Sequence, residues 1–109
     1  RSELAGLDID LPPEAPDGFR HGYHLFAIRV PDRDRVFDAL HRAGIRVQVH
    51  YVPVHHHPLG HDAAVIGDDL RNSDEVYEGL LSMPIFPALT NSDLEKIITT
   101  TREVLERNT

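Results

Sequence analysis

The sequence predicts an α+β domain in which a short β-sheet packs with about three helices. Stretches with strand-type alternation of apolar residues are interleaved with stretches in which apolar residues recur at helical spacing. A glycine or a proline separates most of these stretches, as expected where an element ends. A strand, a helix and a second strand follow one another directly in the first half, and such a unit is typical of α+β and α/β layers.

The composition fits one folded domain of modest size. The chain has 109 residues, of which 40% are hydrophobic and 27% are charged, so it holds enough apolar material for a small core. Its formal net charge of −7 argues against a partner with a phosphate backbone, and we expect no nucleic-acid binding. The absence of cysteine excludes disulfides, thiolate zinc sites and cysteine nucleophiles.

The sequence also bears on where the protein works. No apolar run approaches the roughly 20 residues that cross a bilayer, and no signal-peptide pattern is present. We therefore expect a cytoplasmic protein without a membrane partner. The chain begins at Arg1 rather than methionine, which suggests a processed product or a piece of a longer protein.

The N-terminal residues are expected to precede the main fold. Arg1–Gly6 has the character of a frayed helix end, and Asp8–Gly18 carries three prolines and several acids, as surface connections do. We expect a helix end and linker over residues 1–18 and the folded domain over residues 19–109.

Tyr23–Val30 alternates its apolar side chains and predicts the first strand. A helix is expected to follow Pro31, with Asp32 as its N-cap, because a short acidic side chain can accept hydrogen bonds from the first turn. Gly44 is expected to end this helix. Its apolar side consists of Val36, Phe37, Leu40 and Ala43.

The second strand is expected to begin directly after Gly44, where Ile45 and the next apolar residues alternate with polar ones. Proline cannot donate to a central ladder, so Pro53 predicts that the chain leaves the sheet at about Tyr51–Val52. A phenol and several imidazoles are concentrated at this point. Polar groups at the mouth of a strand indicate a candidate site.

The third quarter of the chain alternates between loop and helix. Leu59–Arg71 has little periodicity and is expected to be a loop, with one helical turn near Asp62–Val65. A helix is expected to begin at Asn72, which has capping-box spacing with Glu75, and to end near Ser82. Its apolar stripe consists of Val76, Tyr77, Leu80 and Leu81.

The last part is expected to hold one more extended piece and the final helix. Met83–Pro87 is short, apolar and framed by prolines, so it is expected to be a buried extended piece or an edge strand. Thr90 and Asp93 are expected to cap the last helix. The apolar residues of that helix are Leu94, Ile97, Ile98, Thr101, Val104 and Leu105.

Five histidines lie within twelve positions, and imidazole is the commonest neutral metal ligand near pH 7. They are His50, His55, His56, His57 and His61. The segment has no HExxH motif, and adjacent imidazoles of an extended chain point in different directions, so at most two of the three neighbours converge. We predict no metal site, with solvated loop histidines or a histidine-rich metal-binding module as the alternatives.

Other catalytic patterns are weak. No serine stands in a GxSxG context, and no glycine-rich phosphate loop occurs. The only lysine, Lys96, lies on the polar side of the last helix, where a solvated surface residue is expected rather than a Schiff-base nucleophile. The acidic residues mostly mark helix starts, where they complement the helix dipole.

Two blocks of sequence carry a resemblance to a known family. The first, GIRVQVHYVPVHHHP, fits an HY-x-P-x-H-x-x-P signature at His50, Tyr51, Pro53, His55 and Pro58. The second follows a helix, and its matching residues are Met83, Pro84, Phe86, Pro87, Leu89 and Thr90. Together the blocks resemble the C-terminal portion of the DegT/DnrJ/StrS family of sugar aminotransferases, over about Tyr23 to Leu105. One departure is that Leu59 and Gly60 stand where the family often has aromatic residues.

The resemblance implies the small domain of an aspartate-aminotransferase-like, fold type I enzyme whose large domain, which binds pyridoxal phosphate, is absent from this chain. It implies a homodimer that transfers an amino group from glutamate to a keto nucleotide-sugar, as in polysaccharide biosynthesis. The catalytic residue, a Schiff-base lysine, would lie outside this chain, so the fragment alone is expected to be inactive. A pyridoxal-phosphate sugar dehydratase on the same scaffold is an alternative that this portion cannot separate.

The resemblance also directs attention to three side chains. His55 is the first candidate for contact with the sugar substrate, followed by His50 and Tyr51, because imidazole and phenol groups hydrogen-bond hydroxyls and phosphates. The residues that touch the cofactor stay unknown. A purely structural interaction domain is a further alternative, in which the His50–Pro58 surface is buried in a dimer contact without a cavity.

Overall fold

The computed structural model describes residues 1–61 and 69–107. Its fold is α+β, as the sequence predicts. In chain order the elements are the 3-10 helix η1 (Ser2–Leu4), strand β1 (Phe26–Arg29), helix α1 (Arg33–Arg42), the 3-10 helix η2 (Val54–His56), helix α2 (Pro58–His61), helix α3 (Arg71–Gly79), strand β2 (Leu80–Met83) and helix α4 (Asn91–Glu106). None of the helices in these described ranges is both long and apolar enough to span a bilayer.

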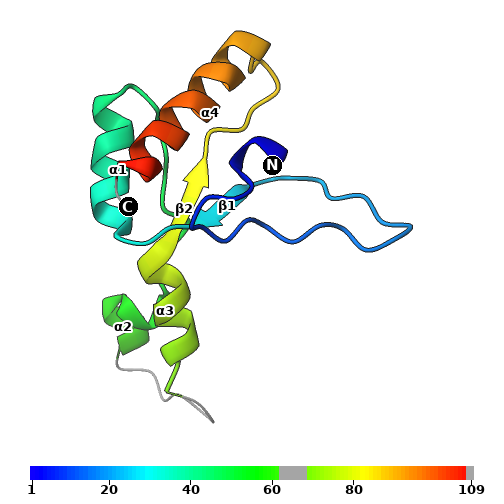
Figure 1. Cartoon of the computed structure of the whole chain (residues 1–109). Helices are drawn as coiled ribbons and strands as arrows, with labels where there is room; N and C mark the ends of the chain where they lie inside the picture. Colours follow the sequence, from blue (N-terminus) through cyan, green and yellow to red (C-terminus); the bar gives the residue numbers. More distant parts are fainter. Residues whose placement is uncertain (62–68, 108–109) are drawn as a thin grey trace.

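A short antiparallel sheet lies at the centre of the fold, between two groups of helices (Figure 1). Strands β1 and β2 pair with Ile28 opposite Leu81, and single bridges to Asp10 and Gln48 extend the two edges. Helix α1 packs against α4 and against β2. Figure 1 shows α1 and α4 at one end of the sheet and α2 and α3 at the other. The sheet thus lies between the pair of helices α1 and α4 and the histidine-rich segment (Figure 1).

The core is formed mainly by the sheet, α1 and the segment after it. Its buried side chains are Ile28, Val30, Val36, Leu40, Ile45, Val47, Leu81, Met83 and Leu105. N-terminal residues also contribute: Leu4 is buried, and Leu7, Ile9 and Leu11 pack against the core. The division into residues 1–18 and 19–109 stays a prediction.

Several expected boundaries are confirmed. The first strand lies within Tyr23–Val30, and Asp32 precedes α1 as its N-cap residue, in the left-handed conformation and without a side-chain cap bond. The cap of α4 has the expected form, because Asp93 N donates to Thr90 Oγ1 at 3.1 Å and Thr90 N donates to Asp93 Oδ2 at 3.1 Å. These two reciprocal bonds satisfy amides that the helix itself leaves open.

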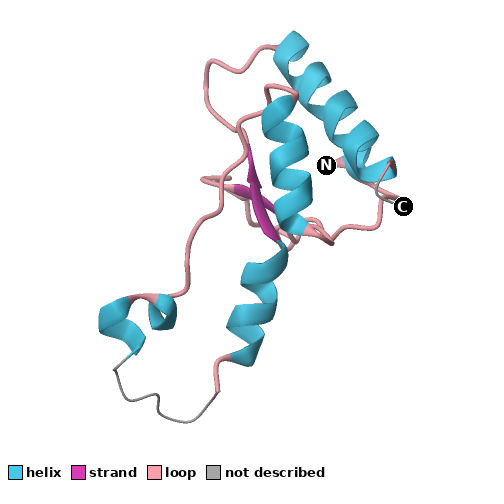
Figure 2. Ribbon diagram, turned by 90° about the vertical axis from the view of Figure 1, so that its left-hand side faces the viewer, coloured by secondary structure: helices cyan, strands magenta, loops and turns pink. Residues whose placement is uncertain are grey.

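The prediction of a second strand directly after Gly44 is wrong. Of the residues in the predicted second strand, only Gln48 pairs with β2, through hydrogen bonds of 3.0 and 2.8 Å to the backbone of Ser82. The neighbouring backbone groups are used elsewhere: Val47 N donates to Ile45 O at 3.1 Å, and His41 Nε2 donates to Val47 O at 2.8 Å. A continuous ladder therefore cannot form, and the segment runs as a loop towards α2 (Figure 2).

The predicted end of the next helix near Ser82 is also wrong. Helix α3 ends at Gly79, whose carbonyl oxygen accepts from Val30 N at 2.9 Å. The following residues form β2 instead, because there Leu81 becomes fully buried against the core. The expected cap at Asn72 is wrong as well: the N-cap residue is Leu70.

The remaining segments are partly as expected. Met83 is buried in β2, but the rest of Met83–Pro87 is not a buried extended piece, since Ile85 and Phe86 are exposed. The predicted loop over Leu59–Arg71 begins inside the one-turn helix α2. The predicted turn near Asp62–Val65 lies outside the described residues.

Candidate functional site

The three predicted substrate-contacting residues lie along one open groove beside α3. His50, Tyr51 and His55 all line this groove, which has a volume of about 750 Å³. Val76 and Tyr77 of α3 line it as well. The segment that follows α1 forms one wall of the groove, and α3 forms the other. Residues more than twenty positions apart in the sequence therefore line the same groove.

His50 presents a polar atom that nothing in the described residues satisfies. Its Nδ1 is buried and has no hydrogen-bond partner there. Its ring packs against Tyr51, with ring centroids 4.7 Å apart. Because buried polar atoms in folded proteins are nearly always paired, His50 Nδ1 is a candidate contact for a group supplied from outside these residues.

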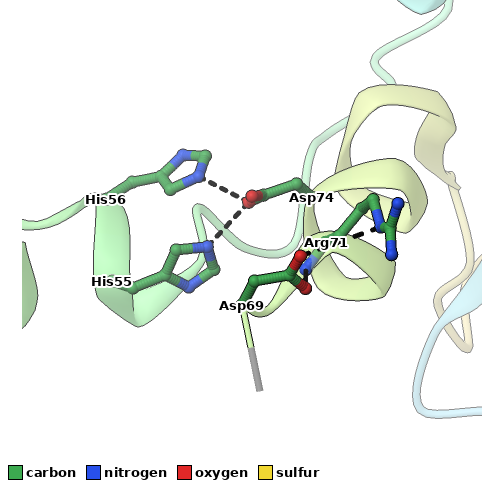
Figure 3. A network of polar contacts seen from close by, with 5 residues as sticks. All are labelled: His55, His56, Asp69, Arg71 and Asp74. Carbon is green, nitrogen blue, oxygen red and sulfur yellow. Dashed lines mark hydrogen bonds and ion pairs between the residues drawn. The ribbon is translucent and has the colours of Figure 1, made fainter. Parts of the chain in front are cut away.

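His55 and His56 converge on one carboxylate. Their Nε2 atoms both donate to Oδ1 of Asp74, each at 2.7 Å. The histidines come from η2 and the aspartate from the first turn of α3, as Figure 3 shows. The three candidate ligand atoms lie within 4.8 Å of one another. This arrangement ties η2 to α3 and is also the geometry of a possible cation site.

Sequence reasoning did not find Asp74. It lies 19 positions from His55, and an acidic residue in a first helical turn is commonly explained by the helix dipole. The expectation that two neighbouring histidines at most converge fits the observed pair, since His57 does not belong to the cluster. No short motif could have indicated which carboxylate the pair would meet.

The cluster keeps Asp74 ionised. The hydrogen bond from His55, followed by the one from His56, holds the pKa of the Asp74 carboxyl below its ordinary value of 3.8. The His56 ring also meets the Tyr77 ring edge-on at 5.6 Å between centroids, and the Arg33 guanidinium lies 5.1 Å from the centre of that same ring. These contacts fix the orientation of His56.

Lys96 lies outside the groove. It is exposed on α4, where it lines a different depression together with Gly44 and Asp93. The only lysine of the sequence is therefore not placed among the three candidate substrate contacts.

The margin of the groove exposes large apolar side chains. Tyr51 and Val54, which line the groove, are 70% and 78% exposed, and Leu59 in α2 is 93% exposed. Exposed apolar side chains gathered in one place are typical of surfaces that another protein segment covers.

Residues 1–102 match the model of the DegT/DnrJ/EryC1/StrS aminotransferase family. Among curated proteins, the chain is 36% identical over 104 residues to a UDP-N-acetyl-3-dehydro-alpha-D-glucosamine 3-aminotransferase of Acidithiobacillus ferrooxidans, covering 94% of this chain and 27% of that protein. It is 37% identical over 108 residues to a dTDP-3-amino-3,4,6-trideoxy-alpha-D-glucose transaminase of Streptomyces venezuelae, covering 97% and 28%.

Two solved structures have the same fold. The DesV structure from S. venezuelae, in complex with a ketimine intermediate, superposes with a TM-score of 0.88 at 37% identity, covering 97% of this chain and 29% of that one. A DegT DnrJ EryC1 StrS aminotransferase from Brucella abortus superposes with a TM-score of 0.84 at 28% identity, covering 95% and 28%. The chain thus spans less than a third of the length of these relatives.

Proposed function

Because the chain belongs to the DegT/DnrJ/EryC1/StrS aminotransferase family, we propose that it is the C-terminal small domain of a pyridoxal-phosphate-dependent enzyme that transfers an amino group from glutamate to a keto nucleotide-sugar. The names of two relatives support this substrate class, since both describe amino transfer on nucleotide-linked sugars. The fold type I class of the solved neighbours agrees with it. The relatives are more than three times as long, which leaves room for a large domain.

The observation that carries the substrate-binding role is the common groove of His50, Tyr51 and His55. His50 Nδ1 has no hydrogen-bond partner within the described residues, and because it is buried, a small shift of the groove wall would bring it to the substrate. Tyr51 adds an exposed phenol that can donate to and accept from hydroxyl or phosphate oxygens. His55 is oriented by Asp74 through its Nε2, so its ring is held in place at the groove wall.

In this proposal the groove orients the sugar, and the cofactor supplies the chemistry. Pyridoxal phosphate, when bound, acts as the electron sink for amino transfer. The described residues fit a role at the edge of such a site rather than as its anchor, because they offer hydrogen-bonding imidazoles and a phenol while Lys96 lies elsewhere. The Schiff-base lysine would come from the large domain, and residues 1–109 alone would be inactive.

The partners follow from the same proposal. The exposed side chains of Tyr51, Val54 and Leu59 would be covered by the large domain or by the second subunit of a homodimer. Such an enzyme would work in the cytoplasm, where nucleotide-sugars and glutamate are available to it.

Substitutions in the groove test the substrate-binding role in the natural polypeptide that contains these residues. We expect His50→Gln and Tyr51→Phe each to lower kcat/KM for the keto nucleotide-sugar about tenfold, the effect of losing one hydrogen bond to the bound substrate. Glutamate-driven conversion of the bound cofactor, followed by its absorbance, should change much less. A drop confined to the glutamate step would contradict a sugar-binding role.

Matched controls lie outside the groove. Tyr23→Phe removes a phenol hydroxyl from a residue that packs beside Phe26, and His57→Gln replaces an exposed imidazole next to the cluster. Both should leave kcat/KM unchanged. Analysis of the product for an amine or a deoxygenated sugar separates an aminotransferase from a dehydratase on the same scaffold.

A further inference from the structure

The His55–His56–Asp74 cluster includes one of the three proposed substrate contacts, His55, and its donor atoms also suit a ligand of a different chemical class. Two imidazole nitrogens and one carboxylate oxygen lie within 4.8 Å of one another, with both N–O distances at 2.7 Å. Neutral imidazole together with a carboxylate is a ligand combination that zinc and neighbouring transition metals accept. Mg²⁺ and Ca²⁺ prefer oxygen ligands and fit this set poorly.

We propose that His55, His56 and Asp74 form a binding site for one divalent transition-metal ion of the zinc class. The inference goes beyond the proposed aminotransferase activity and does not depend on it. It rests on the convergence of three ligand atoms from two elements, η2 and α3 (Figure 3).

The three ligand atoms are near enough to share one ion after a local adjustment. Tetrahedral zinc with bonds of about 2.0–2.1 Å separates its ligand atoms by about 3.3 Å. Both N–O distances must therefore lengthen from 2.7 Å, and the two imidazole nitrogens must adopt the same spacing. The Asp74 side chain is 39% exposed at the start of α3, which leaves room for this adjustment. Each imidazole would carry its proton on Nδ1 and turn the Nε2 lone pair towards the ion.

The surroundings suit an open site. The side chains of His55 and His56 are 21% and 38% exposed, so an ion can enter from solvent and keep water as a further ligand. The edge-on contact between His56 and Tyr77 limits rotation of one ligand. Bound metal would cross-link η2 to α3 and stabilise the wall of the groove that carries His55.

The test is zinc binding by the untagged natural polypeptide, measured by competition with a chromophoric chelator. We expect one equivalent of Zn²⁺ per chain. Asp74→Asn keeps the shape of the side chain but removes the charge, and His56→Ala removes one ligand. Each should weaken binding at least about tenfold, the lower end of the loss seen even for changes in the groups that support metal ligands.

His57→Ala is the matched control, because His57 is an exposed neighbour outside the cluster. It should leave the affinity for Zn²⁺ unchanged. Equal weakening by His57→Ala and Asp74→Asn would overturn the proposal, as would the absence of stoichiometric binding, since either result would indicate nonspecific uptake by a histidine-rich segment or none at all.

A spectroscopic measurement keeps the proposal testable should a variant fail to fold. Unaltered protein loaded with Co²⁺ should show the intense visible absorbance of a tetrahedral site, displaced by one equivalent of Zn²⁺. If the Co²⁺-loaded protein shows no absorbance beyond the weak bands of octahedral aqueous Co²⁺, that result would contradict the proposed site.

Discussion

At the scale of single residues, the polar atoms that lack a partner are as informative as those that have one. His50 Nδ1 and Thr101 Oγ1 are both buried without a hydrogen-bond partner in the described residues. The residue His50 lines an open groove, so its buried Nδ1 lies next to a space that an outside group can enter, whereas the Thr101 residue is fully buried on α4. The unpaired His50 Nδ1 therefore indicates a candidate binding contact. The unpaired Thr101 hydroxyl instead destabilises the fold, because no hydrogen bond offsets the free energy of its desolvation.

Thr101→Val should stabilise the chain by about 1 kcal/mol, because valine has nearly the same shape and removes the unsatisfied hydroxyl. The free energy of unfolding in urea measures this effect. Thr99→Val is the control, since Thr99 is exposed on the same helix and its hydroxyl is solvated, so no gain is expected there. A loss of stability in Thr101→Val would show that the hydroxyl has a partner in solution.

The cap of α4 supports a second prediction at this scale. Thr90→Ala removes the side chain that accepts from Asp93 N and should cost about 1 kcal/mol of unfolding free energy. Ser92→Ala, one position from the capping aspartate and exposed, is the control and should be close to neutral. Equal effects of the two substitutions would mean that the cap contributes nothing specific.

The cap also predicts a dependence on pH. Hydrogen bonds from the Thr90 side chain and then its backbone hold the pKa of Asp93 below its ordinary value of 3.8. A depressed folded pKa adds stability above pH 3.8, and this stability is lost as the pH falls through the folded pKa. The stability difference between the unaltered chain and Thr90→Ala should narrow in urea titrations below pH 3.8. A difference that is constant with pH would contradict this account.

Prediction from sequence worked at this scale where a local pattern was enough. Thr90 and Asp93 were found because a capping box depends on three-residue spacing alone. Asp74 was missed because its partners lie 18 and 19 positions away, and their contact depends on how η2 folds back onto α3. Spacing along the chain carries no information about such a contact.

At the scale of elements, β2 connects the parts of the fold. It follows α3 without a loop, pairs with β1, and bonds to Gln48 through Ser82. Leu80 and Leu81 continue the helical spacing of α3, so periodicity alone extended the predicted helix through them. Tertiary pairing overrides the local pattern here, and burial of Leu81 decides the boundary.

Leu81→Ala should therefore be severely destabilising. Its side chain is fully buried, and its truncation should cost about 2–5 kcal/mol through lost burial and the cavity left behind. Leu59→Ala is the matched control when both variants are measured in residues 1–109 alone, where Leu59 is 93% exposed, and it should change the unfolding free energy by less than about 0.5 kcal/mol. Similar losses in both variants, measured by urea unfolding, would rule out β2 as the centre of the core.

At the scale of the whole molecule, the chain combines a packed core with a groove rimmed by exposed apolar residues. The chain matches the aminotransferase family and spans 27% to 29% of the relatives' length, and in the function proposed above these exposed residues are the ones that a large domain covers. Two short sequence blocks were enough to predict the family, because each matches a family signature and they occur in the same order as in the family. They did not predict the groove itself, which requires α3 to lie opposite the loop after α1.

The most direct test is transfer of nitrogen from ¹⁵N-labelled glutamate to a keto nucleotide-sugar by the natural polypeptide that contains these residues. Mass spectrometry of the product should show a nucleotide-linked amino sugar that carries one ¹⁵N atom, formed only when pyridoxal phosphate is bound. A folded polypeptide that binds no pyridoxal phosphate and transfers no label to any keto nucleotide-sugar would contradict the account.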